Sequence, residues 1–472
     1  MTEVPAAVRD PATLDLSRSR RLHVTNVGGA GMSAVATLLA ESGHVVSGHD
    51  PAASTPFLDL LAGRGVAVST GTERPLLDGG VEAVVVSTAT PPDDPHVAAA
   101  RDRGVPVLHR AAALAALSAV RTTAAVAGTH GKTTTSALLT TILSGAGRDP
   151  GWVVGAGIAH LGRSAAWGGD GPLVVEADES DGTFLALATD VAIVTNVEPD
   201  HLENWGGEEA LREGFRRFVA GVAGPVVLCA DDPGSAALLP AADRPLTYGL
   251  DPAADYRVVD PAPWGTGVRF TLRHVGEDVE VEVPAAPGVH NARNAAGALA
   301  VADALGVPLA DGVAALAAFT GVARRFELRG EAGGVTVVDS YDHLPTEVAA
   351  ALAAAAWGPW QRVVAVFQPH RYSRTAGLWR SFADAFVDAD LLAVTGIYAA
   401  GEAPRPGVTG KLLVDAVLEA HPWAHVAWLP TLDDVLVWLG GVLRPGDLCL
   451  TLGAGDLTDL APRILARLEA DR

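Results

Sequence analysis

The sequence predicts an α/β protein built from three domains in series. The chain of 472 residues is longer than one ordinary hydrophobic core can serve. Twice an apolar strand runs into a glycine-rich loop and then a helix, first near Gly28 and again near Gly128. The alternation of strands and helices restarts near Gly321. We therefore expect domains at residues 1–120, 121–320 and 321–472.

The first domain opens with a strand over 22–27, a glycine-rich turn, a helix over 32–42 and a strand over 44–48 that leads to Asp50. This order is typical of a Rossmann-like nucleotide-binding unit. Asn26 stands where the dinucleotide fingerprint has its first glycine, so the turn alone is a weak signal. We interpret Asp50 as a ribose ligand. The candidate diphosphate-binding residues are Gly28, Gly29, Gly31 and Ser33.

The second domain carries the sharpest local signal, a strand over 123–127 followed by the loop GTHGKTT and a helix over 133–145. Backbone N–H groups of such a loop cradle phosphates, a lysine neutralises them, and a hydroxyl reaches Mg²⁺. Lys132 is one of only two lysines, with Lys411, and Val126 replaces the first glycine of the strict P-loop pattern. The candidate ATP-phosphate residues are Gly128, Thr129, His130, Gly131, Lys132, Thr133 and Thr134.

An acidic run, EADESD from Glu176 to Asp181, ends a later strand of the same domain. The segment TNVEPDHLENW follows it, with Asp200 and His201. Carboxylates at a strand end beside a phosphate loop are hard oxygen ligands for Mg²⁺. The alternative is a solvated acidic loop without a ligand.

The third domain is expected from strands over 335–339, 363–367, 391–395 and 448–452 and a helix over 346–356. The segment FQPHRYSRT follows the second of these strands. Its His370, Arg371 and Arg374 suit a substrate carboxylate, because arginine forks pair with carboxylates in bidentate geometry. The alternatives are a surface basic cluster for these residues and a buried structural histidine for His343.

Composition excludes several classes of protein. The hydrophobic share of 49% and charged share of 19% favour packed cores over disorder, and the net charge of −21 disfavours nucleic-acid binding. Cys229 and Cys449 cannot make a disulfide framework. The longest apolar runs, such as 348–357, are too short to span a membrane, and the opening residues lack the apolar core of a signal peptide. We expect a cytoplasmic protein that binds neither nucleic acid nor membrane, as a monomer or weak homodimer.

Taken together, these segments resemble the Mur ligases of peptidoglycan synthesis. The resemblance runs from about His23 to Asp459, and its markers stand in family order and spacing: HVTNVGGAGMS, AVAGTHGKTTTS, EADESDGTFL, AIVTNVEPDHL, PGVHNARNAAGALA, GVARRFE, FQPHRYSRT, IYAAGEAP and TLGAGD. The GGAGMS turn and the QPHRYSRT segment favour the alanine-adding branch over those that add glutamate, a diamino acid, a dipeptide or a recycled tripeptide.

The resemblance implies an N-terminal UDP-sugar domain, a central P-loop-type ATPase domain and a C-terminal Rossmann-like domain for the amino acid. It implies an ATP- and Mg²⁺-dependent ligase that joins L-alanine to the lactyl carboxylate of UDP-N-acetylmuramate through an acyl phosphate. The implied metal ligands are Thr133, Glu176 and His201, and the implied catalytic residues are Lys132, Glu176, His201, Arg325 and His343. Further ATP-binding residues are His290, Asn291, Asn294 and Arg325, UDP-sugar residues include Ser87 and Ser180, and the L-alanine residues are Tyr341, His370, Arg371 and Arg374.

The departures from the family pattern leave alternatives open. The usual DDYxHHPTE reads DSYDHLPTE, so Ser340 and Leu344 replace an aspartate and a histidine. If Leu344 faces the amino-acid pocket, it should select against serine; otherwise it packs in the core. A diverged paralogue with another amino-acid or peptide substrate, and a non-catalytic nucleotide-binding regulator, remain as alternatives. An oxidoreductase interpretation of the first domain alone is made unnecessary by the second phosphate loop.

Overall fold

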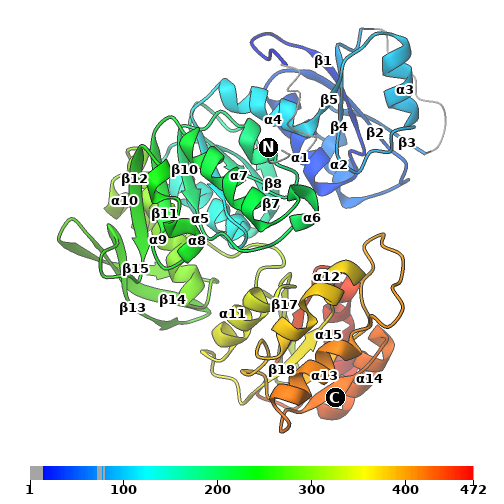
Figure 1. Ribbon diagram of the computed structural model, residues 1–472, viewed down its shortest axis with the longest axis vertical. Helices are drawn as coiled ribbons and strands as arrows, with labels where there is room; N and C mark the ends of the chain where they lie inside the picture. Colours follow the sequence, from blue (N-terminus) through cyan, green and yellow to red (C-terminus); the bar gives the residue numbers. More distant parts are fainter. Residues whose placement is uncertain (1–13, 72–76, 78–79, 471–472) are drawn as a thin grey trace. The chain divides into compact units, whose positions relative to one another are not determined.

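The computed structural model describes residues 14–71, 77 and 80–470. Within these residues the strands form three sheets, and Figure 1 follows the chain through them from blue to red. The chain divides into two compact units. One holds residues up to 260 together with 270–281 and 293–319, and the other holds 261–269, 282–292 and 320–472. The first sheet lies in the first unit and the third sheet in the second unit. The domain boundaries at 120 and 320 stay a prediction.

The first sheet is fully parallel, with the order β3-β2-β1-β4-β5. Its elements are β1 (Arg21–Thr25), α1 (Ala30–Glu41), β2 (Val45–Asp50), α2 (Pro56–Ala62), β3 (Ala67–Thr70), β4 (Ala83–Val86), α3 (Pro95–Asp102), β5 (Val107–His109) and α4 (Arg110–Ala119). This doubly wound order brings the carboxyl ends of β1 and β4 together, where such sheets bind ligands. The prediction of a Rossmann-like domain is confirmed, but β1 ends before the predicted Val27 because Asn26 turns the chain at φ 55°.

The second sheet has ten strands in the order β15-β14-β13-β12-β11-β10-β6-β9-β7-β8. Its strands are β6 (Thr123–Ala127), β7 (Gly151–Ile158), β8 (Arg163–Ala166), β9 (Leu173–Glu176), β10 (Val191–Val194), β11 (Pro225–Cys229), β12 (Arg244–Gly249), β13 (Tyr256–Trp264), β14 (Gly267–His274) and β15 (Glu277–Val283). Its helices are α5 (Lys132–Gly145), α6 (Leu202–Trp205), α7 (Glu208–Ala220), α8 (Pro233–Ala236), α9 (Val289–Ala304) and α10 (Leu309–Leu316). The sequence patterns predicted the strand that is β6 and the strand before the acidic run, β9, but not the β12–β15 extension.

The middle of this sheet is buried on both faces. Every residue of β6 is buried, and the strand pairs in parallel with β9 and β10, so its side chains are all small or apolar. Helix α5 approaches α10 so closely that a Cβ at Gly145 would lie 2.5 Å from the Cβ of Ala315. The first two sheets share a core, since Val153, Trp167 and Leu187 pack against the cluster beneath α1. This packing holds the phosphate loop at the end of a rigid strand.

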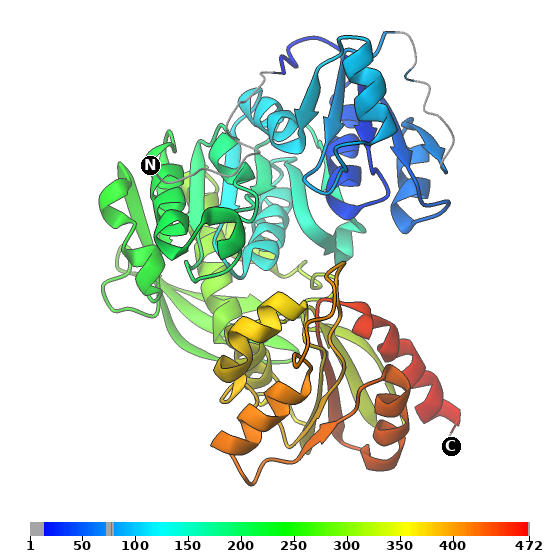
Figure 2. The same ribbon diagram turned by 45° about the vertical axis from the view of Figure 1, so that its right-hand side comes forward.

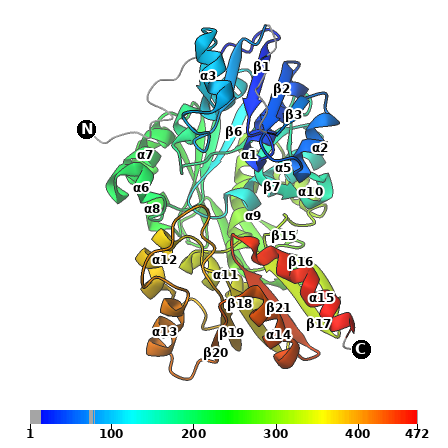
Figure 3. The ribbon, with the colours of Figure 1, turned by 90° about the vertical axis from the view of Figure 1, so that its right-hand side faces the viewer.

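The third sheet has the order β16-β17-β21-β18-β19-β20, with only β16 antiparallel to its neighbour. Its elements are β16 (Glu327–Ala332), β17 (Val335–Ser340), α11 (Pro345–Ala355), β18 (Arg362–Phe367), α12 (Tyr372–Leu378), β19 (Leu391–Val394), α13 (Lys411–Ala420), β20 (Val426–Trp428), α14 (Leu432–Val442), β21 (Asp447–Leu452) and α15 (Leu460–Ala470). One core cluster lies under α11 and α13 and another under α14 and α15. Figures 2 and 3 show the strands between these two groups of helices.

In the described part of the chain no helix has the length and apolarity that a membrane crossing requires.

Candidate active site

The loop after β6 has a backbone that only glycine accommodates. Gly128 has φ 130°, and a Cβ there would lie 2.0 Å from the Thr195 hydroxyl oxygen. Gly131 has φ 79°, and its Cβ would lie 2.9 Å from Oδ1 of Asn294 on α9. Both positions therefore exclude a side chain on conformational and steric grounds. Val126, where the strict pattern has glycine, is instead a buried residue of β6, and the turn begins at Gly128.

A neighbouring segment, 195–198, braces this loop with hydrogen bonds. The N–H of Thr129 donates to the carbonyl of Asn196, and the N–H of His130 donates to Oδ1 of the same residue at 2.8 Å. Nε2 of His130 lies 3.3 Å from Glu198 Oε2. Segment 195–198 therefore braces the loop by contacts that do not involve Lys132, which adds its own bonds to the carbonyls of Gly128 and Thr129.

Lys132 is buried beneath the loop and paired with Glu179, a residue that the sequence did not single out. Its ammonium donates to the Gly128 carbonyl at 2.6 Å and lies 2.8 Å from Glu179 Oε2. Burial opposes the charge of Lys132, but the carboxylates of Glu179 and Asp178 outweigh it and raise its pKa. Burial raises the pKa of Glu179 to about 7 against the attraction of Lys132. Lys132 thus keeps its proton, while Glu179 is the member of the pair that can gain one.

Thr133 and Glu176 form the oxygen pair expected at a magnesium site. The Thr133 hydroxyl lies 3.0 Å from Glu176 Oε1, and the N–H of Gly155 donates to Glu176 Oε2 at 2.7 Å. A Cβ at Gly155 would lie 2.9 Å from Oε1 and 3.2 Å from the hydroxyl, so glycine keeps this space open. Among the described residues no three His, Cys, Asp or Glu side chains could hold a metal together. The pair fits Mg²⁺, which takes most of its ligands from phosphates and water.

His201 lies at the start of α6 with φ 54°, a conformation that non-glycine residues adopt rarely. Asp200 holds it twice: its Oδ1 accepts the His201 N–H at 2.9 Å, and its Oδ2 lies 3.3 Å from Nε2. Strain of this kind clusters at functional sites. The role of His201 as a further metal ligand stays a prediction.

The acidic run is not a solvated loop, because Arg110 of α4 binds it. The guanidinium donates from Nε and Nη2 to Asp181 at 3.1 and 2.8 Å, and from Nη2 to Asp178 at 2.9 Å. Its Nη1 faces the first glycine turn, where a Cβ at Gly31 would lie 3.0 Å away. Sequence reasoning missed Arg110 because its partners lie about seventy residues away; no local pattern joins them.

The first glycine turn is shaped by Asp50. Its Oδ2 accepts the N–H of Gly28 at 2.7 Å, its Oδ1 accepts that of Ala52 at 2.9 Å, and the side chain is buried. A Cβ at Gly28 would lie 2.7 Å from this carboxylate. Asp50 therefore holds the turn itself, a function that its interpretation as a ribose ligand did not include. The hydroxyl of Ser33 likewise donates within α1, to the carbonyl of Ala30.

Of the other predicted nucleotide and sugar residues, Ser87, Ser180 and Asn294 belong to the same unit as these loops, whereas His290 and Asn291 belong to the second unit. Ser87 follows β4, where its N–H donates to the Thr90 hydroxyl, and Ser180 lies in the acidic run, where its N–H donates to Asp178. Asn294 reaches the phosphate loop at Gly131. Earlier on α9, Asn291 donates to the carbonyl of Pro287 and His290 lies beside Gly288.

In the second unit, the predicted amino-acid residues lie together at the carboxyl ends of β17 and β18. The Arg325 guanidinium lies 5.1 Å from the ring centre of Tyr341, which meets His343 edge-on at 5.5 Å. His343 lies 5.5 Å from His370, and Nη1 of Arg374 is 2.9 Å from Nδ1 of His370. These side chains lie close together, and their role in binding an amino acid stays a prediction. The alternative of a surface basic cluster does not fit these residues, because their aromatic rings and guanidinium groups contact one another.

Arg324 was not selected from the sequence, although it precedes Arg325 in the GVARRFE marker. Its guanidinium lies 4.9 Å from the ring centre of Tyr341, so the two arginines share one aromatic ring. It also donates to the carbonyl of Gly453 at 2.8 Å and lies 3.5 Å from the buried Asp339 carboxylate. Arg324 thereby links the ends of β17 and β21 beneath Tyr341.

The two departures in DSYDHLPTE have structural explanations. The Ser340 hydroxyl is buried, accepts the N–H of Phe326 at 3.1 Å and donates to Asp342 at 2.5 Å. Leu344 is 5% exposed at the start of α11, and its N–H donates to Glu347. Leu344 is a core residue, which favours packing over a contact with the amino acid.

Comparison with known families matches three domain descriptions in order along the chain. Residues 21–122 match the Mur ligase family catalytic domain, 126–302 the Mur ligase middle domain, and 324–455 the Mur ligase glutamate ligase domain.

Individual relatives match over nearly their full length. A UDP-N-acetylmuramate–L-alanine ligase of Saccharopolyspora erythraea is 45% identical over 98% of this chain and 96% of its own length. One from an Anaeromyxobacter species is also 45% identical, over 96% and 99%. The crystal structure of a UDP-N-acetylmuramate–alanine ligase from Thermotoga maritima superposes with a TM-score of 0.79 at 26% identity, covering 96% of this chain and 100% of that one.

Proposed function

Because this chain belongs to the Mur ligase family, we propose that it joins L-alanine to the lactyl carboxylate of UDP-N-acetylmuramate with consumption of ATP. The relatives that match it across their full length carry this activity in their names. The observation that carries the proposal is the grouping of Arg325, Tyr341, His343, His370 and Arg374 in one cluster.

The reaction proceeds in two steps. A lactyl carboxylate oxygen attacks the γ-phosphorus of ATP, ADP leaves, and an acyl phosphate forms. The uncharged amine of L-alanine then attacks the acyl carbon, inorganic phosphate leaves, and the nitrogen loses a proton to give the amide. The products are UDP-N-acetylmuramoyl-L-alanine, ADP and phosphate.

Charge neutralisation is the main task of the first step. The loop amides from Gly128 to Thr134 bind the phosphates, and Lys132 exchanges its bonds to Glu179 and the loop carbonyls for phosphate oxygens. Thr133 and Glu176 would hold Mg²⁺, which would supply further neutralisation of the phosphate charge. We assign Arg325 to the phosphates by its place in the family motif.

The second step depends on holding a small zwitterion. Arg371 and Arg374 bind the alanine carboxylate, and Tyr341 and His343 line the side-chain end. The Gly28–Gly31 turn and Arg110 bind the diphosphate of the UDP-sugar. We also propose a cytoplasmic location, which the free, buried state of Cys229 and Cys449 supports.

The test is phosphate release with ATP, Mg²⁺ and UDP-N-acetylmuramate against a panel of amino acids and peptides. We expect release to require L-alanine, with glycine and L-serine as weaker substrates. Faster turnover with another amino acid or a peptide would establish a diverged paralogue instead. ATP binding without any release would establish a non-catalytic nucleotide-binding protein.

A further inference from the structure

The loop 396–402, which follows β19, is bound to the loop that carries the amino-acid residues. The N–H of Tyr398 donates to the carbonyl of Pro369 at 2.9 Å, and the N–H of Arg371 donates to the carbonyl of Tyr398 at 2.8 Å. His370 and Tyr398 thus form an isolated parallel bridge. Two strand-end loops that would otherwise be independent move as one piece.

The Tyr398 ring stacks on His370, with ring centres 5.8 Å apart and planes 14° from parallel. Behind Tyr398 lies Gly455 of the TLGAGD marker, where a Cβ would lie 2.4 Å from Tyr398 Cγ. Gly455 has a negative φ of −97°, so the reason for glycine that the structure shows directly is the lack of space for a Cβ. The tyrosine ring therefore packs directly against the backbone of Gly455.

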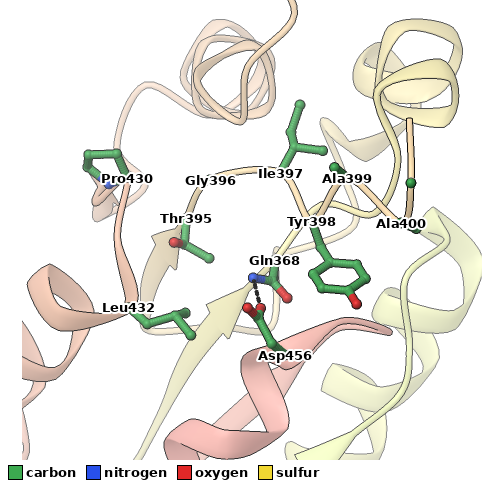
Figure 4. A pocket seen from close by; sticks show the side chains of 11 residues that line it. Gln368, Thr395, Gly396, Ile397, Tyr398, Ala399, Ala400, Pro430, Leu432 and Asp456 are labelled. Atoms are coloured by element: carbon green, nitrogen blue, oxygen red, sulfur yellow. Dashed lines mark hydrogen bonds between the residues drawn. The ribbon is translucent and has the colours of Figure 1, made fainter. Parts of the chain in front are cut away.

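The backbone on either side of Gly455 is fixed by hydrogen bonds, whereas Tyr398 borders an open cavity. Nε2 of Gln368 donates to Asp456 at 2.8 Å, and the N–H of Leu457 donates back to Oε1 of Gln368, which fixes the chain on both sides of Gly455 (Figure 4). The ring itself borders a cavity of about 500 Å³ and is 36% exposed. Tyr398 is thus only partly covered, and the contacts that position it among the described residues include Gly455 and the bridge to His370.

A second side chain of the loop fixes the helix that carries Arg374. The Glu402 carboxylate accepts the N–H of Ser373 at 2.8 Å and also its hydroxyl. It thereby anchors the first turn of α12, directly after Arg371. The loop 396–402 thus contacts the amino-acid residues at both their aromatic and their cationic ends.

His370 is neutral because it is buried among other histidine and arginine side chains. Burial, and then the nearby His343, Arg374 and Arg371, lower its pKa to about 3. His370 is therefore neutral near pH 7, and its Nδ1 accepts a hydrogen bond from Nη1 of Arg374. A shift of this ring would release Arg374 as well.

We propose that Tyr398 is a positioning residue for amino-acid recognition, which holds His370, and through it Arg374, in the geometry that binds the amino-acid carboxylate. This rests on the proposed function, in which His370 and Arg374 belong to the L-alanine site. Tyr398 acts through His370.

The kinetic test compares Tyr398→Leu with Tyr398→Phe, which keeps the stacked ring. We expect the leucine variant to raise KM for L-alanine about tenfold, while kcat and the KM values for ATP and UDP-N-acetylmuramate change less than about twofold. The phenylalanine variant should restore KM for L-alanine to within about twofold of wild type. An unchanged KM for L-alanine in a folded leucine variant overturns the proposal, and so does an equal loss in both variants.

Gly455→Ala tests the same inference without altering Tyr398. It should raise KM for L-alanine in the same direction, because its Cβ would lie 2.4 Å from Tyr398 Cγ and 2.5 Å from Gln368 Oε1 and would displace the tyrosine ring. Gly441→Ala on α14 is the matched control, since a Cβ there meets nothing within 4 Å. If Gly455→Ala leaves KM for L-alanine at the control value, the support of Tyr398 by Gly455 is refuted.

A readout that does not depend on turnover separates this inference from the proposed function. The His370 ring resonances, assigned with a His370→Gln variant, should not titrate between about pH 5.5 and 8 in wild type but should begin to titrate in Tyr398→Leu. If wild type shows no L-alanine-dependent phosphate release, the proposed function fails while the titration still decides whether Tyr398 positions His370. Identical titration in the two proteins overturns the inference.

Discussion

Three neighbouring histidines, His23 of β1, His49 of β2 and His96 of α3, should make the first sheet and its helix sensitive to mild acid. His23 of β1 is 5% exposed and lies between Ser47, whose hydroxyl is 2.9 Å from Nδ1, and the ring of His96 at 4.9 Å. The His49 ring lies 4.3 Å from that of His96, tilted by 37°. Nε2 of His23 is buried without a hydrogen-bond partner. Protonation would therefore place a charge at a buried nitrogen that has no hydrogen-bond partner among the described residues.

The magnitude follows from the shift in pKa. Burial, and then His96 and His49, lower the pKa of His23 from 6.5 to about 4, against the weaker attraction of Asp94. A depressed histidine pKa means that the unfolded chain binds the proton more tightly, so stability is full above pH 6.5 and is lost as the pH falls toward 4. Linkage between these two pKa values gives a loss of about 2 kcal/mol at pH 5 and about 3 kcal/mol below pH 4.

Hydrogen exchange of peptides that span β1 is a suitable assay, because it reports local opening in a chain of several domains. After correction for intrinsic exchange rates, the opening free energy of wild type should fall by about 2 kcal/mol more than that of His23→Val between about pH 7.5 and 5. Peptides of β17 in the other unit serve as the control and should respond alike in both proteins. An equal loss in β1 of wild type and variant would refute the reasoning.

Three further predictions concern the site. Lys132→Ala should lower phosphate release by about 100-fold or more without loss of far-UV circular dichroism, because the loop is braced independently; near-normal release would contradict the assignment. Arg110→Gln should raise KM for UDP-N-acetylmuramate by about 10- to 100-fold, the equivalent of one charge-assisted hydrogen bond, and an unchanged KM in steady-state kinetics would show that Nη1 is not used. Leu344→His should leave the alanine-to-serine ratio of kcat/KM within about twofold and lower the melting temperature instead, because Leu344 is buried; a changed ratio would place it in the pocket.

Local signals in the sequence determined the strand–loop–helix units and the chemistry at their ends. The glycines at 128 and 131 were recognisable because a phosphate loop needs positive φ and close approach, and the structure has both. His343, His370 and Arg374 were also recognisable, since each follows a predicted strand of the third domain. Their contact itself is set by the fold, because β21 lies between β17 and β18 in the sheet. Hydrophobic periodicity, backbone conformation and strand polarity depend on residues close together in the chain, so they can be predicted from the sequence.

Only the tertiary structure decided how the polar groups are partnered. The sequence left the acidic run open between a solvated loop and a metal site, whereas folding pairs Asp178 and Asp181 with Arg110 and buries Glu179 on Lys132. The tertiary structure alone also shows that Gly455 leaves the space that the Tyr398 ring occupies. These contacts join residues about fifty to seventy positions apart, and sheet order and helix packing set them. The same two residues can form an ion pair in water or in the protein interior, and the desolvation cost differs between the two. Burial, which only the fold supplies, therefore decides the protonation and pairing of each charged group.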